Sequence, residues 1–281
     1  MMGEYLHLCQ NYASMYYSAT KFLLSYLVKH KKLKSLVIGI SGGIDSAITA
    51  AIARSVVNQI PNVKLIGRSL PMKPSKKDEI QRSIKIGSSL CDDFKVTDLE
   101  KAYRNFIKYI EIRRFTKILS LEEKIRMGNI RARIRMIQLY HLAHEYEGMV
   151  LSTDNLTEYY LGFWTLHGDV GDFGVMQNLW KTEVYGLAKY ISDKYELIDR
   201  SDISENIKSC IKAEPTDGNG ISESDLIQIE ANSYFEVDNI LIDYIVNKNS
   251  KYLYHPVIKR HENTHVKRNN PLNIPRSILI D

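Results

Sequence analysis

A short segment near residue 40 combines glycines, hydroxyls and an acid. Ser41-Gly42-Gly43-Ile44-Asp45-Ser46 follows an apolar run. Two adjacent glycines let the backbone approach a ligand closely, and the amides at the start of a helix bind anions. Asp45 would repel a phosphate unless it held a divalent cation that bridges the phosphate oxygens. The segment therefore predicts a Mg²⁺-dependent nucleotide site, and the alternative is a plain strand–turn–helix connection that Asp45 caps.

This segment differs from the phosphate-binding loop of the common phosphoryl-transferring NTPases, because no Gly-Lys-Ser/Thr follows it. The elements around it alternate between strands and helices. Short apolar runs predict strands at 35–40, 63–70, 94–99, 148–153 and 175–179. Helical spacing predicts helices at 5–29, 45–57, 77–90, 102–119, 129–146 and 181–194.

This alternation predicts an α/β fold: an open five-stranded parallel sheet with helices on both faces and a helical N-terminal extension. Ligands bind beyond the carboxyl ends of the strands in such a sheet, which is where the glycine segment lies. Residues 211–225 and 259–275 are rich in Gly, Asn, Pro and charge, and we expect loops there that cover a bound substrate.

The composition is that of a globular protein with a sizeable core. Of 281 residues, 44% are hydrophobic and 25% are charged, which excludes disordered, collagen-like and disulfide-rich classes. The apolar stretches are shorter than the roughly 18–20 residues that span a bilayer. The first 30 residues lack the pattern of a signal peptide. We therefore expect no membrane partner.

The cysteines and the net charge indicate the cellular location and the kind of ligand. Three cysteines without a CxxC pair or a His/Cys cluster predict a reducing, cytoplasmic location and no structural zinc site. A net charge of +5 suits an anionic nucleotide as well as a nucleic acid.

Several segments together resemble a known family. Residues 41–46 resemble the pyrophosphate-binding loop of the N-type ATP pyrophosphatases, which include GMP, asparagine and NAD synthetases and tRNA-modifying thiolases. Residues 128–136 (GNIRARIRM) resemble the GNxxARxRM helix of the ammonia-dependent NAD synthetases. Residues 152–158, with Gly162-Phe163 and Gly168-Asp169, resemble that family's GTDxxxE, GFF and GDGG segments.

The resemblance runs from about Gly39 to Lys181, with weaker similarity as far as Arg268. It implies the N-type ATP pyrophosphatase fold in a single domain over residues 1–281. Within that domain it implies a helical extension at 1–32, a nucleotide-binding core at 33–200, and C-terminal loops and a helix at 201–281. It also implies a homodimer.

The resemblance assigns site residues by role. The residues implied to bind ATP are Gly39, Ile40, Ser41, Gly42, Gly43, Ile44, Asp45, Ser46, Thr153, Lys181 and Thr216. Asp45 and Glu158 are implied to ligate Mg²⁺ and, with Lys181, to form the catalytic set. The residues implied to bind the acid substrate are Arg133, Asp169, Asp172 and Lys267.

Each charged candidate also has a purely structural interpretation. Glu158 stands three residues after Asn155, which is the spacing of a capping box. Arg133 has arginine neighbours at alternate positions and could belong to a solvated helix face. Lys181 could simply begin a helix, and Lys267 could lie in a solvated tail.

The implied reaction is the ATP-dependent amidation of nicotinic acid adenine dinucleotide to NAD with ammonia. It would pass through an acyl-adenylate and release AMP and pyrophosphate, so the chain would be a ligase that forms a C–N bond. Nitrogen would come from free ammonia or from a separate glutaminase, because 281 residues leave no room for a glutaminase domain.

Two departures from the family pattern keep another substrate open. Leu166 stands where the family has a substrate-binding lysine, and Val266 stands where it has a histidine. An amidoligase of the same fold that acts on nicotinate mononucleotide or a specialised metabolite is therefore the first alternative. A tRNA-modifying ATP pyrophosphatase is a second, although the chain lacks the zinc-binding cysteine pairs. A non-catalytic nucleotide sensor is a third.

Overall fold

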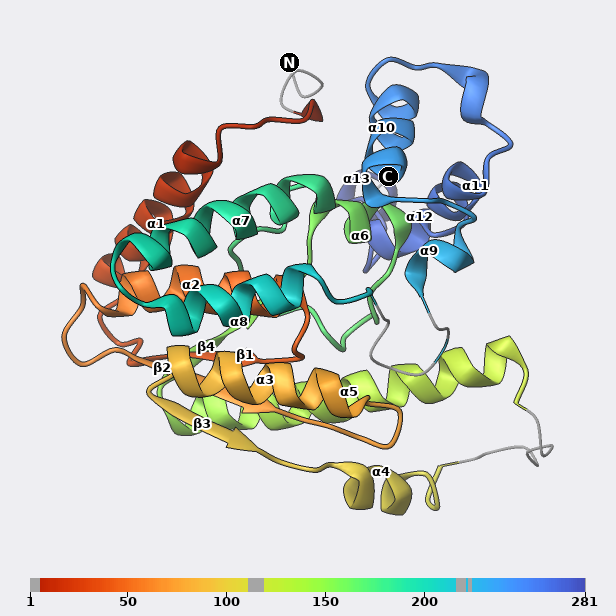
Figure 1. Cartoon of the computed structure of the whole chain (residues 1–281). Helices are drawn as coiled ribbons and strands as arrows, with labels where there is room; N and C mark the ends of the chain where they lie inside the picture. Colours follow the sequence, from red (N-terminus) through yellow and green to blue (C-terminus); the bar gives the residue numbers. More distant parts are fainter. Residues whose placement is uncertain (1–5, 111–118, 216–220, 222–223, 281) are drawn as a thin grey trace.

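The computed structural model describes residues 6–110, 119–215, 221 and 224–280. Within these residues lies one five-stranded sheet (Figure 1). Its strands are β1 (Ser35–Gly39), β2 (Lys64–Ser69), β3 (Asp93–Val96), β4 (Gly148–Ser152) and β5 (Phe173–Gly174). The spatial order is β3-β2-β1-β4-β5, and every pair is parallel. The predicted fold class is confirmed.

Helices cover both faces of this sheet. One face carries α1 (Tyr12–Lys29), α2 (Ile44–Val57), α3 (Lys77–Leu90), α7 (Lys181–Leu197) and α8 (Ser201–Ile211), which pack around one large core. The other face carries α5 (Leu121–Glu145), with α4 (Glu100–Phe106) beside it.

The central strand β1 shows why the sheet needs two helical layers. Leu36 and Ile38 belong to the core under α2, whereas Val37 packs with Leu142 of α5 on the opposite face. Successive side chains of a strand point to opposite faces. A continuous apolar run is therefore stable only where both faces are covered.

A separate apolar cluster lies at the carboxyl-end edge of the sheet. It is built by α6 (Leu156–Leu161), α10 (Tyr234–Ile245) and α11 (Pro256–Asn263), with the buried Trp180 at its centre. The remaining short elements are α9 (Asp225–Gln228), η2 (Ser250–Tyr252), α12 (His265–Arg268) and α13 (Arg276–Leu279).

Several predicted boundaries were wrong. The N-terminal helix begins at Tyr12 instead of residue 5, because Asn11 caps it. The helix predicted at 129–146 begins at Leu121, where Ser120 and Glu123 form a capping box. The helix predicted at 102–119 runs from Glu100 to Phe106, and residues 111–118 lie outside the described part.

Two further predictions gave the wrong type of secondary structure. Residues 175–179 are not the fifth strand, which is the two-residue β5 just before them. Residues 259–268 are not a loop, because α11 and α12 occupy them. His255 caps α11 and Pro256 fills its first turn, where a missing N–H costs nothing. Among the described residues, no helix is both long and apolar enough to cross a membrane.

Candidate active site

The glycine segment forms a tight turn between β1 and α2. Gly42 has a φ of +86°, and a Cβ on it would lie 2.2 Å from the carbonyl oxygen of Glu79. Glycine is therefore required at this position. Ser41 and Ser46 close the turn from inside, since the Ser41 amide donates to Ser46 Oγ (3.2 Å) and the Gly43 amide donates to Ser41 Oγ (3.1 Å).

Three charged side chains converge beside this turn. Asp45 lies in the first turn of α2, Glu158 in the first turn of α6, and Lys181 at the first position of α7. Lys181 Nζ donates to Asp45 Oδ2 and, at 3.2 Å, to Glu158 Oε1. Burial by itself would lower the pKa of Lys181, but the two carboxylates raise it well above its usual value. The lysine is therefore held as a cation.

The capping interpretation of Glu158 and its position in this cluster are compatible. The Glu158 amide donates to Asn155 Oδ1 at 3.0 Å, and Glu158 Oε2 accepts from the Asn155 amide at 3.4 Å, so the capping box is present. The other carboxylate oxygen, Oε1, faces Lys181. Asn155 also donates to Asp45 Oδ1 at 3.0 Å, which ties the two acids into one arrangement.

The first turn of α7 is fixed by a buried acid on α10. Asp238 accepts from the Thr157 hydroxyl (2.5 Å) and from the Thr182 amide (2.9 Å), and the Lys181 amide donates to Thr157 Oγ1 (2.8 Å). Burial raises the pKa of Asp238 to about 6. These bonds set the position of Lys181. Sequence reasoning missed Asp238, because no local motif marks it.

The donor set fits a divalent cation. Asp45 and Glu158 approach one ammonium nitrogen from two different helices, so their oxygens converge on a point where positive charge is favourable. Carboxylate oxygens are the ligands that Mg²⁺ prefers. Together with phosphate oxygens from a nucleotide, these two acids could hold Mg²⁺.

The charged cluster lines a cavity of about 830 Å³, which we term the large cavity. A second, narrow cavity of about 200 Å³ adjoins it between the carboxyl ends of β1, β2 and β4. The predicted residues that line one or both of them are Gly39, Ile40, Ser41, Gly43, Ile44, Asp45, Ser46, Thr153, Glu158, Asp169, Lys181 and Lys267. The site thus lies at the edge of the sheet that the sequence predicted.

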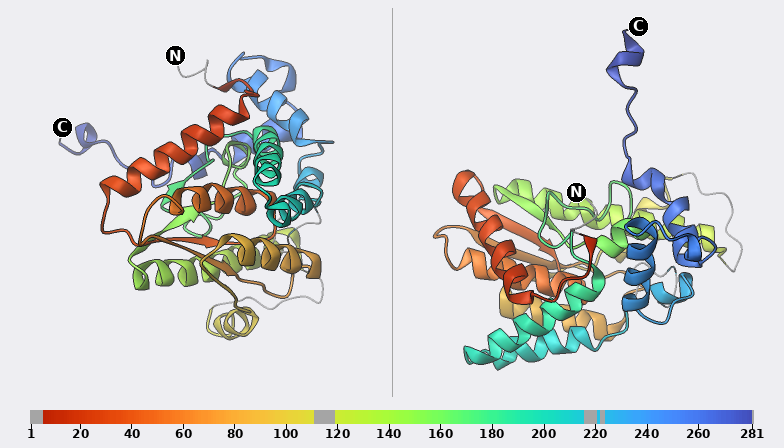
Figure 2. Two further views of the ribbon diagram at one scale, coloured as in Figure 1. Left: turned by 60° about the vertical axis from the view of Figure 1, so that its left-hand side comes forward. Right: turned by 90° about the horizontal axis from the view of Figure 1, so that it is seen from above.

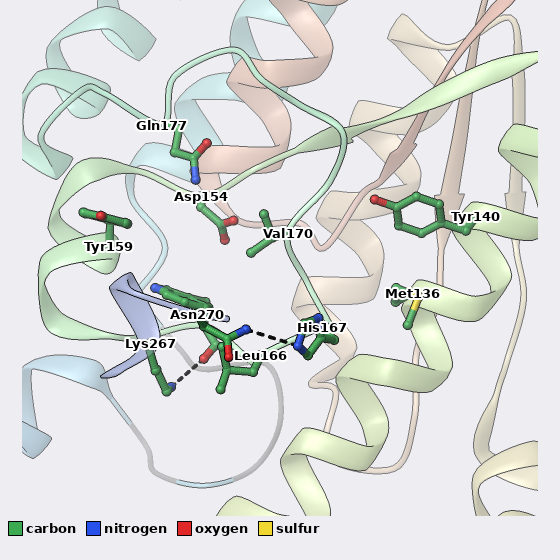
Figure 3. Close-up of a pocket in the computed structure, with 11 residues that line it drawn as sticks. Met136, Tyr140, Asp154, Tyr159, Leu166, His167, Val170, Gln177, Lys267 and Asn270 are labelled. Atoms are coloured by element: carbon green, nitrogen blue, oxygen red, sulfur yellow. Dashed lines mark hydrogen bonds between the residues drawn. The ribbon is translucent and has the colours of Figure 1, made fainter. Parts of the chain in front are cut away.

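A third cavity of about 450 Å³, the outer cavity, opens beside these two (Figure 3). Its walls come from α5, from the segment after β4 and from the C-terminal region, and they include Tyr140, Leu166 and Asn270. Lys267 lies at its rim and donates to the carbonyl oxygens of Gly162 and Trp164, both at 2.6 Å. Lys267 is therefore bound to the protein on one side of the cavity and is not part of a solvated tail.

Comparison with known proteins identifies the family. The family model described as NAD synthase matches residues 15–271. The chain belongs to the NAD synthase family. It is therefore a ligase of the kind that forms a carbon–nitrogen bond with ATP as co-substrate. The family resemblance predicted from the motifs is confirmed.

Individual relatives of the NAD synthase family match over much of their length. An NH3-dependent NAD+ synthetase of Thermoplasma acidophilum is 31% identical over 255 residues, which cover 89% of this chain and 95% of that protein. One from Methanocaldococcus jannaschii is 34% identical over 184 residues, covering 64% and 67%.

Solved structures match the fold at lower identity. An NMN synthetase of Francisella tularensis has a TM-score of 0.75 at 24% identity and covers 94% of this chain and 98% of that one. An NH3-dependent NAD synthetase of Campylobacter jejuni has a TM-score of 0.68 at 22% identity and covers 94% and 100%.

Two residues that the resemblance assigned to the acid substrate, Arg133 and Asp172, do not line the cavities. Arg133 donates to the carbonyl oxygen of Leu166 at 3.1 and 3.2 Å, so it fastens the segment that walls the outer cavity. Asp172 accepts from the Val150 amide and from the Tyr140 hydroxyl, both at 2.9 Å. Asp172 is also exposed at the surface. Thr216 lies outside the described residues.

Two residues of the NAD synthase motifs line the cavities without having been predicted. Arg135 borders both the large and the narrow cavity, and its Nε donates to the Leu70 carbonyl at 3.0 Å. Asp154 is buried between the large and outer cavities. Burial and the charge of Asp169 raise the pKa of Asp154 to about 7. Arg135 lies within the motif at residues 128–136 and Asp154 within the motif at residues 152–158. Membership of these motifs was the one sequence feature that could have marked the two residues as part of the site.

Proposed function

We propose that this chain amidates nicotinic acid adenine dinucleotide to NAD with ammonia, through an acyl-adenylate. The observation that carries the proposal is the convergence of Asp45, Glu158 and Lys181 on one wall of the large cavity, next to the Gly42 turn. With a divalent cation on its two acids, such a cluster would hold a triphosphate through the cation and the Lys181 ammonium. The adjoining outer cavity offers room for the acid that attacks it.

In the first step, an oxygen of the substrate carboxylate attacks the α-phosphorus of ATP, and the bond to pyrophosphate breaks. Negative charge grows on the leaving pyrophosphate, and Lys181 and the amides at the start of α2 lie where they can stabilise it. In the second step, ammonia attacks the acyl carbon, loses a proton, and the bond to AMP breaks. The products are the amide and AMP.

Mg²⁺ belongs to this proposal as a cofactor held by Asp45 and Glu158. When bound, it would supply positive charge between the phosphate oxygens of ATP. Asp45 and Glu158 are each about 18% exposed, so they can reach a cation that enters from the cavity. Asn155 keeps the Asp45 carboxylate turned toward the cavity through its 3.0 Å hydrogen bond.

The partners we propose are ATP, ammonia, the nicotinate dinucleotide and a second copy of the chain in a homodimer. Free ammonia or a separate glutaminase would supply the nitrogen. The cytoplasmic location inferred from the cysteine pattern remains a prediction. We also expect no nucleic-acid partner, because the chain lacks the zinc-binding cysteine pairs of the tRNA-modifying enzymes.

An end-point assay by mass spectrometry tests the reaction. The protein would be mixed with ATP, Mg²⁺, an ammonium salt and nicotinic acid adenine dinucleotide. We expect NAD and AMP in equal amounts, and loss of both in Asp45→Asn. The matched control is Asp193→Asn, which removes an exposed acid of α7 and should leave both products unchanged.

Two outcomes would change the proposal. If nicotinate mononucleotide were amidated and the dinucleotide were not, the substrate would be the first alternative raised by Leu166. The family model and the named relatives do not favour that alternative. If no pyrophosphate were released in the presence of either nicotinic acid adenine dinucleotide or nicotinate mononucleotide, the proposed reaction would be wrong.

A further inference from the structure

Helix α6 is short, and other parts of the chain hold its first turn. It has six residues, and a helix of that length is not stable on its own in water. Asn155 caps its start, and Asp238 accepts from the Thr157 hydroxyl in its first turn. Because α6 carries Glu158, the position of this acid depends equally on what holds the other end of the helix.

The far end of α6 presents three backbone carbonyls that the helix itself does not satisfy. The amides of Gly162 and Phe163 close the last turn by donating to earlier carbonyls of α6. No backbone amide in the described part of the chain donates to the carbonyls of Tyr160, Leu161 or Gly162. Such carbonyls at the end of a helix carry partial negative charge and attract donors, cations above all.

Basic side chains of the C-terminal region bind all three of these carbonyls, at distances between 2.6 and 3.0 Å. We term these four side chains the basic clamp, and they are Arg260, His261, Lys267 and Arg268. They come from α11 and α12, which Figure 1 shows beside α6. The right-hand view of Figure 2 shows the same blue helices next to the green chain of α6. The C-terminal region therefore serves as the missing cap of α6.

Arg268 ties the end of α6 to the end of α11. Its Nη1 donates to the Tyr160 carbonyl and its Nη2 to the His261 carbonyl, both at 2.8 Å. The two ends are in direct contact, since a Cβ on Gly162 would lie 2.5 Å from Cβ of Thr264. Arg268 is half-buried and lines none of the three cavities. It is thus placed to hold the helix and not to touch a ligand.

Glu158 takes part in both ends of this short helix. Its amide donates to the Asn155 side chain at the start of α6, and its carbonyl accepts from the Phe163 amide, at 3.0 Å, in the last turn. Phe163 in turn lies under the guanidinium of Arg260, 3.7 Å from the ring centre. A shift of the last turn therefore moves the backbone of Glu158 and the carboxylate that faces the large cavity.

We propose that Arg268 is a positioning residue for Glu158, and that through the end of α6 it sets the affinity of the site for a divalent cation. The proposal rests on the proposed function in one respect, which is that Glu158 is a cation ligand. Removing a group that orients a metal ligand typically weakens metal binding 10- to 100-fold. We expect the lower end of that range for Arg268→Met, because His261 still donates to the Tyr160 carbonyl.

The test measures the affinity for α,β-methylene ATP by calorimetry, once with Mn²⁺ and once with EDTA. The methylene bridge cannot be cleaved where adenylation would release pyrophosphate, so the nucleotide stays intact and no acid substrate or ammonia is needed. The gain in affinity that Mn²⁺ gives measures the cation site separately from the rest of the nucleotide site. We expect this gain to be roughly 10-fold smaller in Arg268→Met than in the parent, with an equal affinity in EDTA. Arg268→Lys keeps a cation at the carbonyl and should recover part of the gain.

Arg276→Met is the matched control, because it removes an exposed arginine of α13. Its affinities with Mn²⁺ and with EDTA should equal those of the parent. Amide hydrogen exchange without metal or nucleotide gives a second readout that does not depend on a ligand. The amides of residues 160–163 should exchange at least ten times faster in Arg268→Met than in this control.

Three results would overturn the proposal. One is a gain from Mn²⁺ that is as large in Arg268→Met as in the control, or absent from the parent chain. Another is an equal loss of affinity with Mn²⁺ and with EDTA, which would show a general effect on the fold. The third is unchanged exchange at the end of α6. The amidation assay plays no part in these measurements, so a failure there would count against the proposed function alone.

Discussion

Removal of the Lys181 charge is the sharpest test of the site. In Lys181→Met, the side chain keeps its length and loses its ammonium, and Asp45 and Glu158 are left facing each other without a shared cation. The Lys181 side chain is 5% exposed and each acid is 18% exposed, so water can replace little of the lost attraction. We therefore expect a large loss of stability in the absence of ligands.

The magnitude follows from the distances. Unit charges 3.2 Å apart attract by about 5 kcal/mol at an effective dielectric constant of about 20. The cost of dehydrating the three groups offsets part of this. Deleting one partner of a buried ion pair typically costs about 3–5 kcal/mol, because the remaining charge stays uncompensated. At roughly 2–4 °C per kcal/mol for domains of similar size, Tm should fall by about 10 °C.

Mg²⁺ should act differently on the two proteins. In the parent chain without ATP, Mg²⁺ must displace Lys181 from the two acids, so we expect little change in Tm. In Lys181→Met, the acids have no competing cation, and Mg²⁺ should raise Tm by several degrees. Thermal unfolding followed by circular dichroism, with and without Mg²⁺, measures both effects.

A matched control is available on the same helix. Lys189→Met removes an exposed lysine of α7 and should leave Tm and its response to Mg²⁺ unchanged. The reasoning is refuted if Lys181→Met melts together with this control. It is also refuted if Mg²⁺ stabilises the parent and the variant equally.

Three further predictions concern the turn, a buried acid and two arginines. Gly42→Ala should weaken ATP binding at least tenfold by calorimetry, because its Cβ would meet a backbone oxygen at 2.2 Å, whereas Gly43→Ala would meet only a side chain at 3.3 Å and should bind nearly as the parent. Asp154→Asn should become more stable than the parent as pH rises from about 4 to 7, as measured by urea unfolding. The raised pKa means that the folded parent holds a proton that the unfolded chain releases, so the parent loses stability over that window. Arg135→Gln should reduce ATP affinity, whereas Arg133→Gln should leave it unchanged and raise the KM of the acid, because Arg133 holds the wall of the outer cavity.

A specific outcome would contradict each of these three predictions. Equal ATP binding by Gly42→Ala and Gly43→Ala would show that the close approach to α3 does not matter. A pH-independent effect of Asp154→Asn would contradict the burial of its charge. Equal loss of ATP affinity in the two arginine variants would show that the helix presents them to the same ligand.

Sequence reasoning succeeded where a single local property decides the structure. The run from Leu36 to Ile40 before Ser41 is apolar and short, as expected of a strand buried on both faces, and β1 is such a strand. It failed at β5, because a strand of two residues has too little pattern to detect. It also failed at α11, where the charged and polar composition of residues 259–263 concealed a helix held by Val257 and Ile258 against the core.

The sequence by itself named the residues of the candidate site. The glycines at 42 and 43, Asp45, Glu158 and Lys181 could each be named from a short motif, because the constraints on a phosphate turn and on the start of a helix act over a few neighbouring residues. Only the tertiary structure decided which charges meet. Lys181 contacts acids that are 136 and 23 positions away in sequence, and Arg135, not Arg133, reaches the cavities. The physical reason is that these contacts depend on how α2, α6 and α7 pack at one edge of the sheet, and the packing of distant helices leaves no trace in local spacing.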